Sequence, residues 1–311
     1  MSELLLTPRS NSGFALFSAL MGGQLAPNKL WLSPSWRAKF FLRSMLTPVS
    51  SGRHLHQIAT CETLQKILPQ QPTLPGKIHR PYLHLGLSVS QRVAAIHQHY
   101  RFVAQLKRDD LRKGMLSASG FELACFSGKD GEAITLTMIC NGRCEREGEV
   151  NLLLHCDGTL LGVLTFAVTE RNGKPQLVIG GLQGAHRETP HEFIRHATKA
   201  CYGLFPKRIL LEALMQLAAA MGITQIYAVR DGGHVFHCLR YRLKKRALFH
   251  ACYDEFWQSV SATAISRYLY QLPLSLPQKP LAEIASKKRA EYRRRYALLA
   301  QLHQQLSRFT R

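Results

Sequence analysis

The spacing of apolar residues changes partway along the chain. Between residues 88 and 113 they recur every three or four positions, which predicts an amphipathic helix. After Gly114 apolar and polar residues alternate, which predicts strands with one face against a core. Five such segments follow one another: residues 121–126, 134–139, 150–156, 160–168 and 176–179.

Short turn signals separate these five segments. Asn-Gly and Asp-Gly pairs favour the positive backbone φ angles of tight β-hairpins. The signals are Gly128-Lys129-Asp130-Gly131, Asn141-Gly142, Asp157-Gly158 and Asn172-Gly173. Periodicity and turn chemistry therefore agree on an antiparallel meander.

The pattern becomes helical after the fifth segment. Pro190, with Thr189 as its cap, opens a predicted helix that runs to about Tyr202. Pro206 opens a second and clearer helix that ends at Gly222. Helices in this position return the chain to the sheet.

Two further elements complete the pattern. Residues 224–229 predict a short strand, and residues 282–306 predict a long helix. We expect the strands ending at Ile179 and Val229 to be neighbours in one sheet and to splay apart near Gly180–Gly184. The basis is a meander that continues into strand, helices and strand.

The chain is therefore expected to have an α+β fold, with a central antiparallel sheet, helices on one face and a long basic C-terminal helix. Residues 76–311 form the α+β domain, and residues 1–75 a helical N-terminal region with a Pro-rich linker. Trp31, Trp36 and Phe41 in that region lie among lysines and arginines. This mixture is typical of a helix on a membrane surface, and also of a helix that packs aromatic side chains on a core.

The same order of elements is the layout of GNAT-type acyltransferases, here over about residues 115–245. Those enzymes hold the cofactor pyrophosphate at a helix N-terminus, where the first amides lack internal partners and the helix dipole is positive. We therefore expect an acyl-CoA or a related phosphate-bearing donor. The candidate binding residues are Gly180, Gly181, Gln183 and Gly184 in the turn and Gly203, Lys207 and Arg208 near the helix start.

Two features oppose this interpretation. The spaced-glycine signature of GNAT loops is not present at Tyr202–Arg208, and two helices stand where one is expected. The glycines at 180, 181 and 184 also fit a bulge and an exit turn, in which no ligand approaches the backbone.

Acid–base chemistry has one candidate constellation. His234 follows a pair of glycines just after a predicted strand, where catalytic groups often lie, and Asp231 and Tyr241 are its proposed partners. A loop histidine with satisfied hydrogen bonds is the alternative. No metal is expected, because the histidines at 186, 191 and 196 do not have the i, i+4 spacing of a zinc helix.

Charge narrows the choice of partners. The chain has 41 Lys and Arg against 20 Asp and Glu, a net charge of +21, which favours polyanions. Residues 287–295 of the last predicted helix carry six of these cations, a cluster that suggests an anionic partner. No nucleic-acid-binding motif is recognised, so nucleic acid is not the expected partner. The candidates are an anionic membrane surface, an envelope protein and a small-molecule donor.

Eight cysteines are scattered through the chain, mostly within apolar runs. No convincing secretory signal precedes them, and nowhere do eighteen apolar residues run together. We therefore expect reduced cysteines and a cytoplasmic location, with peripheral association at the inner membrane as a second possibility.

Five short motifs occur in a fixed order: Arg80-Pro81-Tyr82, Gly180–Gly184, residues 198–208, Tyr253–Trp257 and residues 286–296. Their combination, over roughly residues 70–310, resembles the VirK/YbjX family. The enterobacterial members of that family are linked with virulence, resistance to cationic antimicrobial peptides and localisation of surface proteins. The resemblance implies a process, and it does not specify a reaction.

Two function hypotheses follow. The first is a VirK-like factor that supports envelope integrity and peptide resistance through a GNAT-like acyltransferase activity. The second is a non-catalytic basic adaptor that holds an anionic membrane surface or a protein partner by charge.

Overall fold

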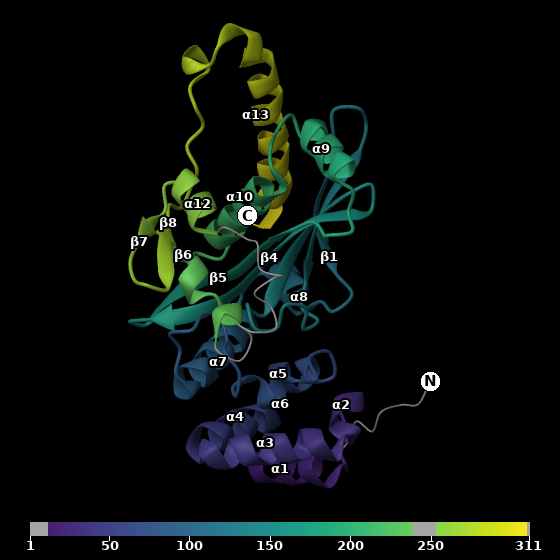
Figure 1. Cartoon of the computed structure of the whole chain (residues 1–311), viewed down its shortest axis with the longest axis vertical. Coiled ribbons are helices and arrows are strands. Elements are labelled where there is room, and N and C mark those ends of the chain that lie inside the picture. Colours follow the sequence, from purple (N-terminus) through teal and green to yellow (C-terminus); the bar gives the residue numbers. More distant parts are fainter. Residues whose placement is uncertain (1–11, 239–252, 310–311) are drawn as a thin grey trace.

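The structure is a computed structural model and describes residues 12–238 and 253–309. One mixed β-sheet runs through these residues (Figure 1). Its strands lie in the order β1-β2-β3-β4-β5-β6-β8-β7. Their bounds are Phe121–Ser127 (β1), Ala133–Ile139 (β2), Val150–Cys156 (β3), Thr159–Arg171 (β4), Lys174–Gly184 (β5), Ile226–Val229 (β6), Thr263–Ala264 (β7) and Leu269–Leu272 (β8). All neighbours pair antiparallel except β5 and β6, which are parallel. The predicted α+β class and the meander are thus confirmed.

Turn chemistry explains two of the hairpins. Asp157 and Gly158 have φ angles of 46° and 76°, and Asn172 and Gly173 have 52° and 72°, as tight two-residue hairpins require. The turn predicted at Asn141-Gly142 does not close a tight hairpin, because β2 ends at Ile139 and β3 begins only at Val150. The longer connection carries two buried carboxylates, Glu147 and Glu149.

Helices cover both faces of the sheet, so the expectation of helices on one face is wrong (Figure 1). On β4, Phe166 and Val168 belong to one buried cluster and Ala167 to the other. Residues 161–169 of that strand are all buried, which is the pattern of a strand covered on both sides.

The two helical layers come from different parts of the chain. One consists of α1 (Gly13–Gly22), α2 (Lys29–Leu32), α3 (Pro34–Leu46), α4 (Pro48–Thr60), α5 (Glu62–Ile67), α6 (Leu74–Lys77) and α7 (Val89–Gln105), with α8 (Asp109–Leu116) at its border with the first strands. The other consists of α9 (His191–Ala200), α10 (Pro206–Ala220), α12 (Tyr253–Ser259) and α13 (Ser286–Leu306). None of the described helices combines the length and the apolar character that a membrane crossing needs.

β5 and β6 separate where the sequence predicts. Residues 177–179 of β5 pair with residues 226–228 of β6, and β5 then continues to Gly184 against β4 alone. The register of β4 and β5 shifts between Thr165 and Phe166, which leaves Gly180 as a bulge. The prediction of neighbouring strands that splay near Gly180–Gly184 is confirmed.

A buried ion pair joins the N-terminal helices to the sheet. The Lys77 ammonium donates to Glu149 Oε1 at 2.7 Å, and the hydroxyls of Tyr82 and Tyr100 donate to the same carboxylate at 2.6 and 2.7 Å. Burial alone would raise the pKa of Glu149, but Lys77 and these donors hold that pKa below its ordinary value. The network ties α6 and α7 to the start of β3.

The outer edge of the sheet is covered from the far end of the chain. β1 is an edge strand, and the Gln305 side chain both donates to the carbonyl of Cys125 at 2.6 Å and accepts from its N–H at 2.8 Å. Arg308 donates to the carbonyls of Glu122 and Leu123. These groups satisfy backbone atoms that an uncovered edge would present to other chains.

Candidate functional site

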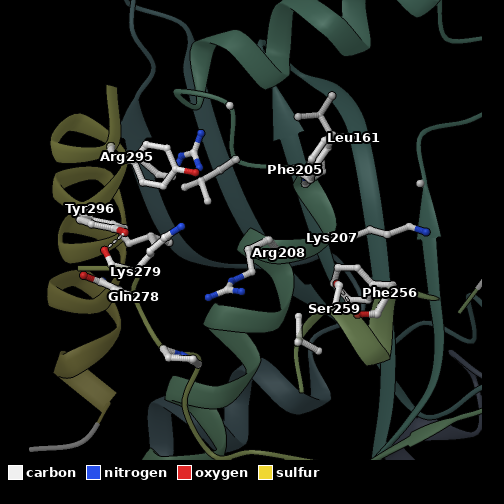
Figure 2. Close-up of a pocket in the computed structure, with 18 of the residues that line it drawn as sticks. Leu161, Phe205, Lys207, Arg208, Phe256, Ser259, Gln278, Lys279, Arg295 and Tyr296 are labelled. Atoms are coloured by element: carbon white, nitrogen blue, oxygen red, sulfur yellow. Dashed lines mark hydrogen bonds between the residues drawn. The ribbon is translucent and has the colours of Figure 1, made fainter. Parts of the chain in front are cut away.

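A cavity of about 870 Å³ opens between the end of β5, the start of α10, α12 and α13 (Figure 2). Its size is in the range of pockets that hold small molecules and cofactors. The cavity includes the first turn of α10, where Pro206 stands at the first helical position and no described side chain caps the helix. Four of the predicted cofactor residues line it: Gly184, Gly203, Lys207 and Arg208.

Cationic side chains from α10, α13 and the loop before α13 line this cavity, with Arg208, Lys279 and Arg295 on one side and the Lys207 ammonium pointing to the other (Figure 2). Arg208 on α10 pairs with the buried carboxylate of Glu212 at 2.9 Å. Arg295 on α13 donates to the carbonyl of Tyr202 at 2.9 Å. Lys207 and Lys279 complete the set. The arrangement suits a ligand that carries several negative charges.

Aromatic rings form the walls between these cations. Phe205, Phe256, Tyr292 and Tyr296 all line the cavity, and the Phe205 ring is 69% exposed. The Tyr296 hydroxyl donates to the carbonyl of Lys279 at 2.7 Å, which joins the loop before α13 to that helix. Exposed rings beside cations can stack on a flat heterocycle while the cations hold phosphates.

The backbone explains why a glycine stands at 203. Its φ angle is +78°, in the left-handed region that favours glycine. A Cβ there would also crowd the guanidinium of Arg295. Gly203 therefore shapes the cavity wall by making room for a cation.

A second cavity of about 700 Å³ adjoins the first. The two share the wall formed by Ile194, Gly203, Phe205 and Pro206. Four further cations line the second cavity: Lys129, Arg195, Lys199 and Arg294. The acidic residue on its wall, Glu291, is paired with Arg295. Both cavities thus present positive charge.

The other predicted turn residues lie in a buried polar cluster between β5 and the connection before β3. The Gln183 amide donates to both carboxylate oxygens of Glu147, at 3.0 and 2.9 Å. Nε2 of His234 lies 3.3 Å from Glu147 Oε1, and both side chains are buried. The Leu182 N–H donates to the Tyr253 hydroxyl, and burial raises the pKa of Tyr253 well above its ordinary value.

The glycines at 180 and 181 make room for this cluster. A Cβ at Gly180 would overlap the carbonyl of Glu147, and one at Gly181 would overlap its carboxylate. The group that approaches both glycines closely is therefore Glu147 of the same chain, through its backbone at Gly180 and its side chain at Gly181. In the described residues, Gly180, Gly181 and Gln183 do not line either cavity, and they favour the bulge interpretation.

A matched pair of substitutions tests this packing. Gly180→Ala is expected to lower the free energy of unfolding by about 1–3 kcal/mol, because backbone must shift to admit the methyl group. Gly184→Ala meets nothing within 4 Å and should change stability by less than about 0.5 kcal/mol. Urea unfolding of both variants measures the difference. Equal stabilities would show that the loop at Glu147 moves freely.

Two of the proposed acid–base residues, Asp231 and His234, lie near each other, but their side chains face different partners. The Asp231 carboxylate accepts the backbone N–H groups of Tyr253 and Asp254, at 2.7 and 3.3 Å, and so holds the start of α12. His234 faces Glu147 instead. Tyr241 lies outside the described residues. The catalytic assignment stays a prediction.

Several lining residues were not identified from the sequence. These residues lie 48 to 88 positions after Arg208, and no local pattern connects them to it: Phe256, Lys279, Tyr292 and Tyr296. Tyr292 and Tyr296 belong to the motif at 286–296 and Phe256 to the motif at 253–257, but neither motif by itself predicts a cavity wall. No three His, Cys, Asp or Glu side chains in the described residues are grouped to hold a metal ion. The seven cysteines in those residues are free.

Fold and site together define an α+β protein with two adjoining cationic cavities, one of them walled by aromatic rings. The chain belongs to the family described as "Protein of unknown function (DUF535)", whose model matches residues 29–308. The relation to the VirK/YbjX family that the motifs predict is thereby confirmed.

Known proteins resemble the chain to different extents. It is 40% identical to "Uncharacterized protein YbjX" of Escherichia coli K12 over 309 residues, which cover 99% of this chain and 93% of that protein. An "Uncharacterized protein" of Haemophilus influenzae is 34% identical over 127 residues, which cover 41% of this chain and 42% of that protein. No solved structure matches.

Proposed function

We propose that the larger cavity binds an acyl-CoA or a related phosphate-bearing donor, and that the protein transfers the acyl group to an acceptor. The observation that carries this proposal is the cavity at the start of α10, where cations of three elements meet aromatic walls. The positive end of the α10 dipole lies at this cavity and adds to the attraction for phosphate. Aromatic rings such as Phe205 would stack on the adenine.

The order of elements supports the same proposal. An antiparallel meander leads into the parallel pair β5 and β6, which separate at a bulge, and the second of the two helices between them, α10, begins at the cavity. GNAT-type acyltransferases have this layout and place their donor at such a splay. This argument is one of architecture, because a fold by itself does not determine an activity.

In the proposed reaction, a nucleophilic oxygen or nitrogen of the acceptor attacks the thioester carbonyl carbon. The carbon–sulfur bond breaks, the thiolate of CoA leaves, and the proton of the nucleophile ends on that sulfur or in solvent. The second cavity, which meets the first at Phe205, is the proposed acceptor site. Its four cations favour an acceptor with negative charge.

The proposal extends to the process that the family resemblance implies. An acyl transfer of this kind, carried out at the cytoplasmic side of the inner membrane, would support envelope integrity and resistance to cationic peptides. The alternative is a non-catalytic adaptor. It is favoured by the exposed cations at the start of α13, Lys287, Lys288, Arg293 and Arg294, which can hold an anionic partner without any reaction.

Calorimetric titration with a series of donors tests the proposal. We expect CoA and acetyl-CoA to bind and pantetheine, which lacks the nucleotide and its phosphates, to bind at least 100-fold more weakly. Lys207→Gln and Lys279→Gln should each weaken CoA binding about 10- to 100-fold, as the loss of a charged hydrogen bond does.

Lys174→Gln, in the hairpin between β4 and β5, is the matched control and should bind CoA as the wild type does. Absence of CoA and acyl-CoA binding by the wild type would overturn the proposal. Binding that neither cavity variant weakens would place the donor elsewhere and overturn it as well.

A further inference from the structure

Exposed apolar side chains are concentrated in one part of the molecule. Among the described residues, eight of the eleven large exposed apolar side chains lie between residues 14 and 49. They come from α1 to α4: Phe14, Leu30, Leu32, Phe41, Leu42, Met45, Leu46 and Val49. Concentration of this kind marks an interaction surface, whereas single exposed apolar residues are ordinary.

Helix α3 is apolar on two sides. Phe40, on the side that faces the protein, is buried with Trp31 in the N-terminal core. On the other side the pairs Phe41 and Met45, and Leu42 and Leu46, stand at i, i+4 spacing and are exposed. Since the other side of α3 is already buried in the protein, the outward stripe is additional apolar surface, which marks an interaction surface.

The segment that forms α1 to α4 carries only positive charge. Residues 12–61 contain five Lys or Arg and no Asp or Glu, a net charge of +5. The cations are Lys29, Arg37, Lys39, Arg43 and Arg53, of which Lys29, Lys39 and Arg53 are exposed. An apolar stripe bordered by cations is the pattern of a helix that lies in a membrane interface.

We propose that the outward face of α1 to α4, defined by the eight exposed apolar residues above, docks on an anionic lipid bilayer. The apolar side chains enter the boundary of headgroups and acyl chains, and the cations contact acidic headgroups. A second copy of the chain fits less well, because two surfaces of charge +5 would face each other.

This surface differs from the basic start of α13, which is the other candidate for lipid contact. None of the described residues of α13 is a large exposed apolar side chain, so that helix offers charge without an anchor. The helices α1 to α4 also lie at the end of the molecule away from α13 and its cavities (Figure 1). Docking there would leave both cavities open to solvent, and the inference does not depend on the proposed reaction.

Co-sedimentation with vesicles tests the inference, using phosphatidylcholine alone and phosphatidylcholine with phosphatidylglycerol. The full chain is expected to bind the mixed vesicles and to bind the neutral ones weakly. The triple variant Leu42→Gln, Leu46→Gln and Val49→Gln, whose native side chains are 61–84% exposed, should bind the mixed vesicles roughly 100-fold more weakly. Lys39→Gln with Arg53→Gln should weaken binding about 30-fold at low salt.

Two controls make the result specific. Ile265→Gln with Leu274→Gln removes exposed apolar side chains elsewhere and should leave binding unchanged. Circular dichroism should show that the triple variant keeps its fold, since exposed positions contribute little to stability. Unchanged vesicle binding by the folded triple variant would overturn the inference.

Two other results would also overturn it. If the double variant Arg293→Gln with Arg294→Gln loses vesicle binding and the triple variant keeps it, the lipid contact lies on α13. A wild-type dimer that sediments as a monomer only after the triple substitution, with no vesicle binding, would make the face an interface between two copies.

Discussion

Replacing Lys77 by methionine is expected to lower the free energy of unfolding by about 3–5 kcal/mol. Lys77 and Glu149 are both buried, and their 2.7 Å contact compensates two charges that have left water. Methionine fills a similar volume but leaves the Glu149 carboxylate with only its two tyrosine donors. Urea unfolding followed by circular dichroism measures the loss.

A second substitution separates charge from packing. Adding Glu149→Gln to Lys77→Met removes the uncompensated charge and should restore a large part of the stability. Lys66→Met breaks an exposed pair with Glu62 and should cost less than about 1 kcal/mol. If Lys77→Met costs no more than Lys66→Met, the buried pair does not hold the helices to the sheet as described.

Acidification from pH 7 to pH 5 is expected to destabilise the protein by on the order of 2 kcal/mol for each of His54 and His99. Both side chains are fully buried, and desolvation lowers the pKa of each to about 4. The unfolded chain takes up protons on these residues below about pH 6.5, while the folded chain does not until about pH 4. Stability therefore falls as the pH drops through this window.

The substitution His99→Gln tests the effect at one position. The glutamine oxygen can replace Nδ1 as acceptor for the N–H of Val168, which His99 accepts at 3.1 Å. Loss of stability between pH 7 and pH 5 should then shrink by about 2 kcal/mol. The same pH dependence in His99→Gln and the wild type would contradict the prediction.

Local patterns in the sequence predicted most of the central sheet. Alternation and turn residues located β1 to β4 to within three residues, because each hairpin is specified by neighbours in the chain, and placed β5 but ended it five residues early. β7 and β8 were missed. β7 has only two residues, and β8 is as long as the predicted β6 but has none of its β-branched residues. The second helical layer was missed although the continuous apolar run in β4 indicated it.

The sequence predicted only the part of the candidate site whose residues are close to one another along the chain. Gly203, Lys207 and Arg208 are close in sequence to the helix start that they surround, and they do line the cavity. The position of His234 after a strand predicts a site residue there. Its partner Glu147 lies 87 residues earlier, and no sequence pattern around Glu147 connects the two. Pairs of this kind depend on how β5, β6 and the connection before β3 meet, which periodicity does not encode.

The covering of β1 by Gln305 has a consequence for synthesis on the ribosome. These two partners are separated by 180 residues, so β1 leaves the ribosome long before Gln305 exists. At roughly 5–20 residues per second the interval is on the order of 10–40 s. During that time the newly made edge has no cover of its own and can pair with other nascent chains. Expression yield should therefore respond to chaperone supply and growth temperature more strongly than the stability of the finished fold would suggest.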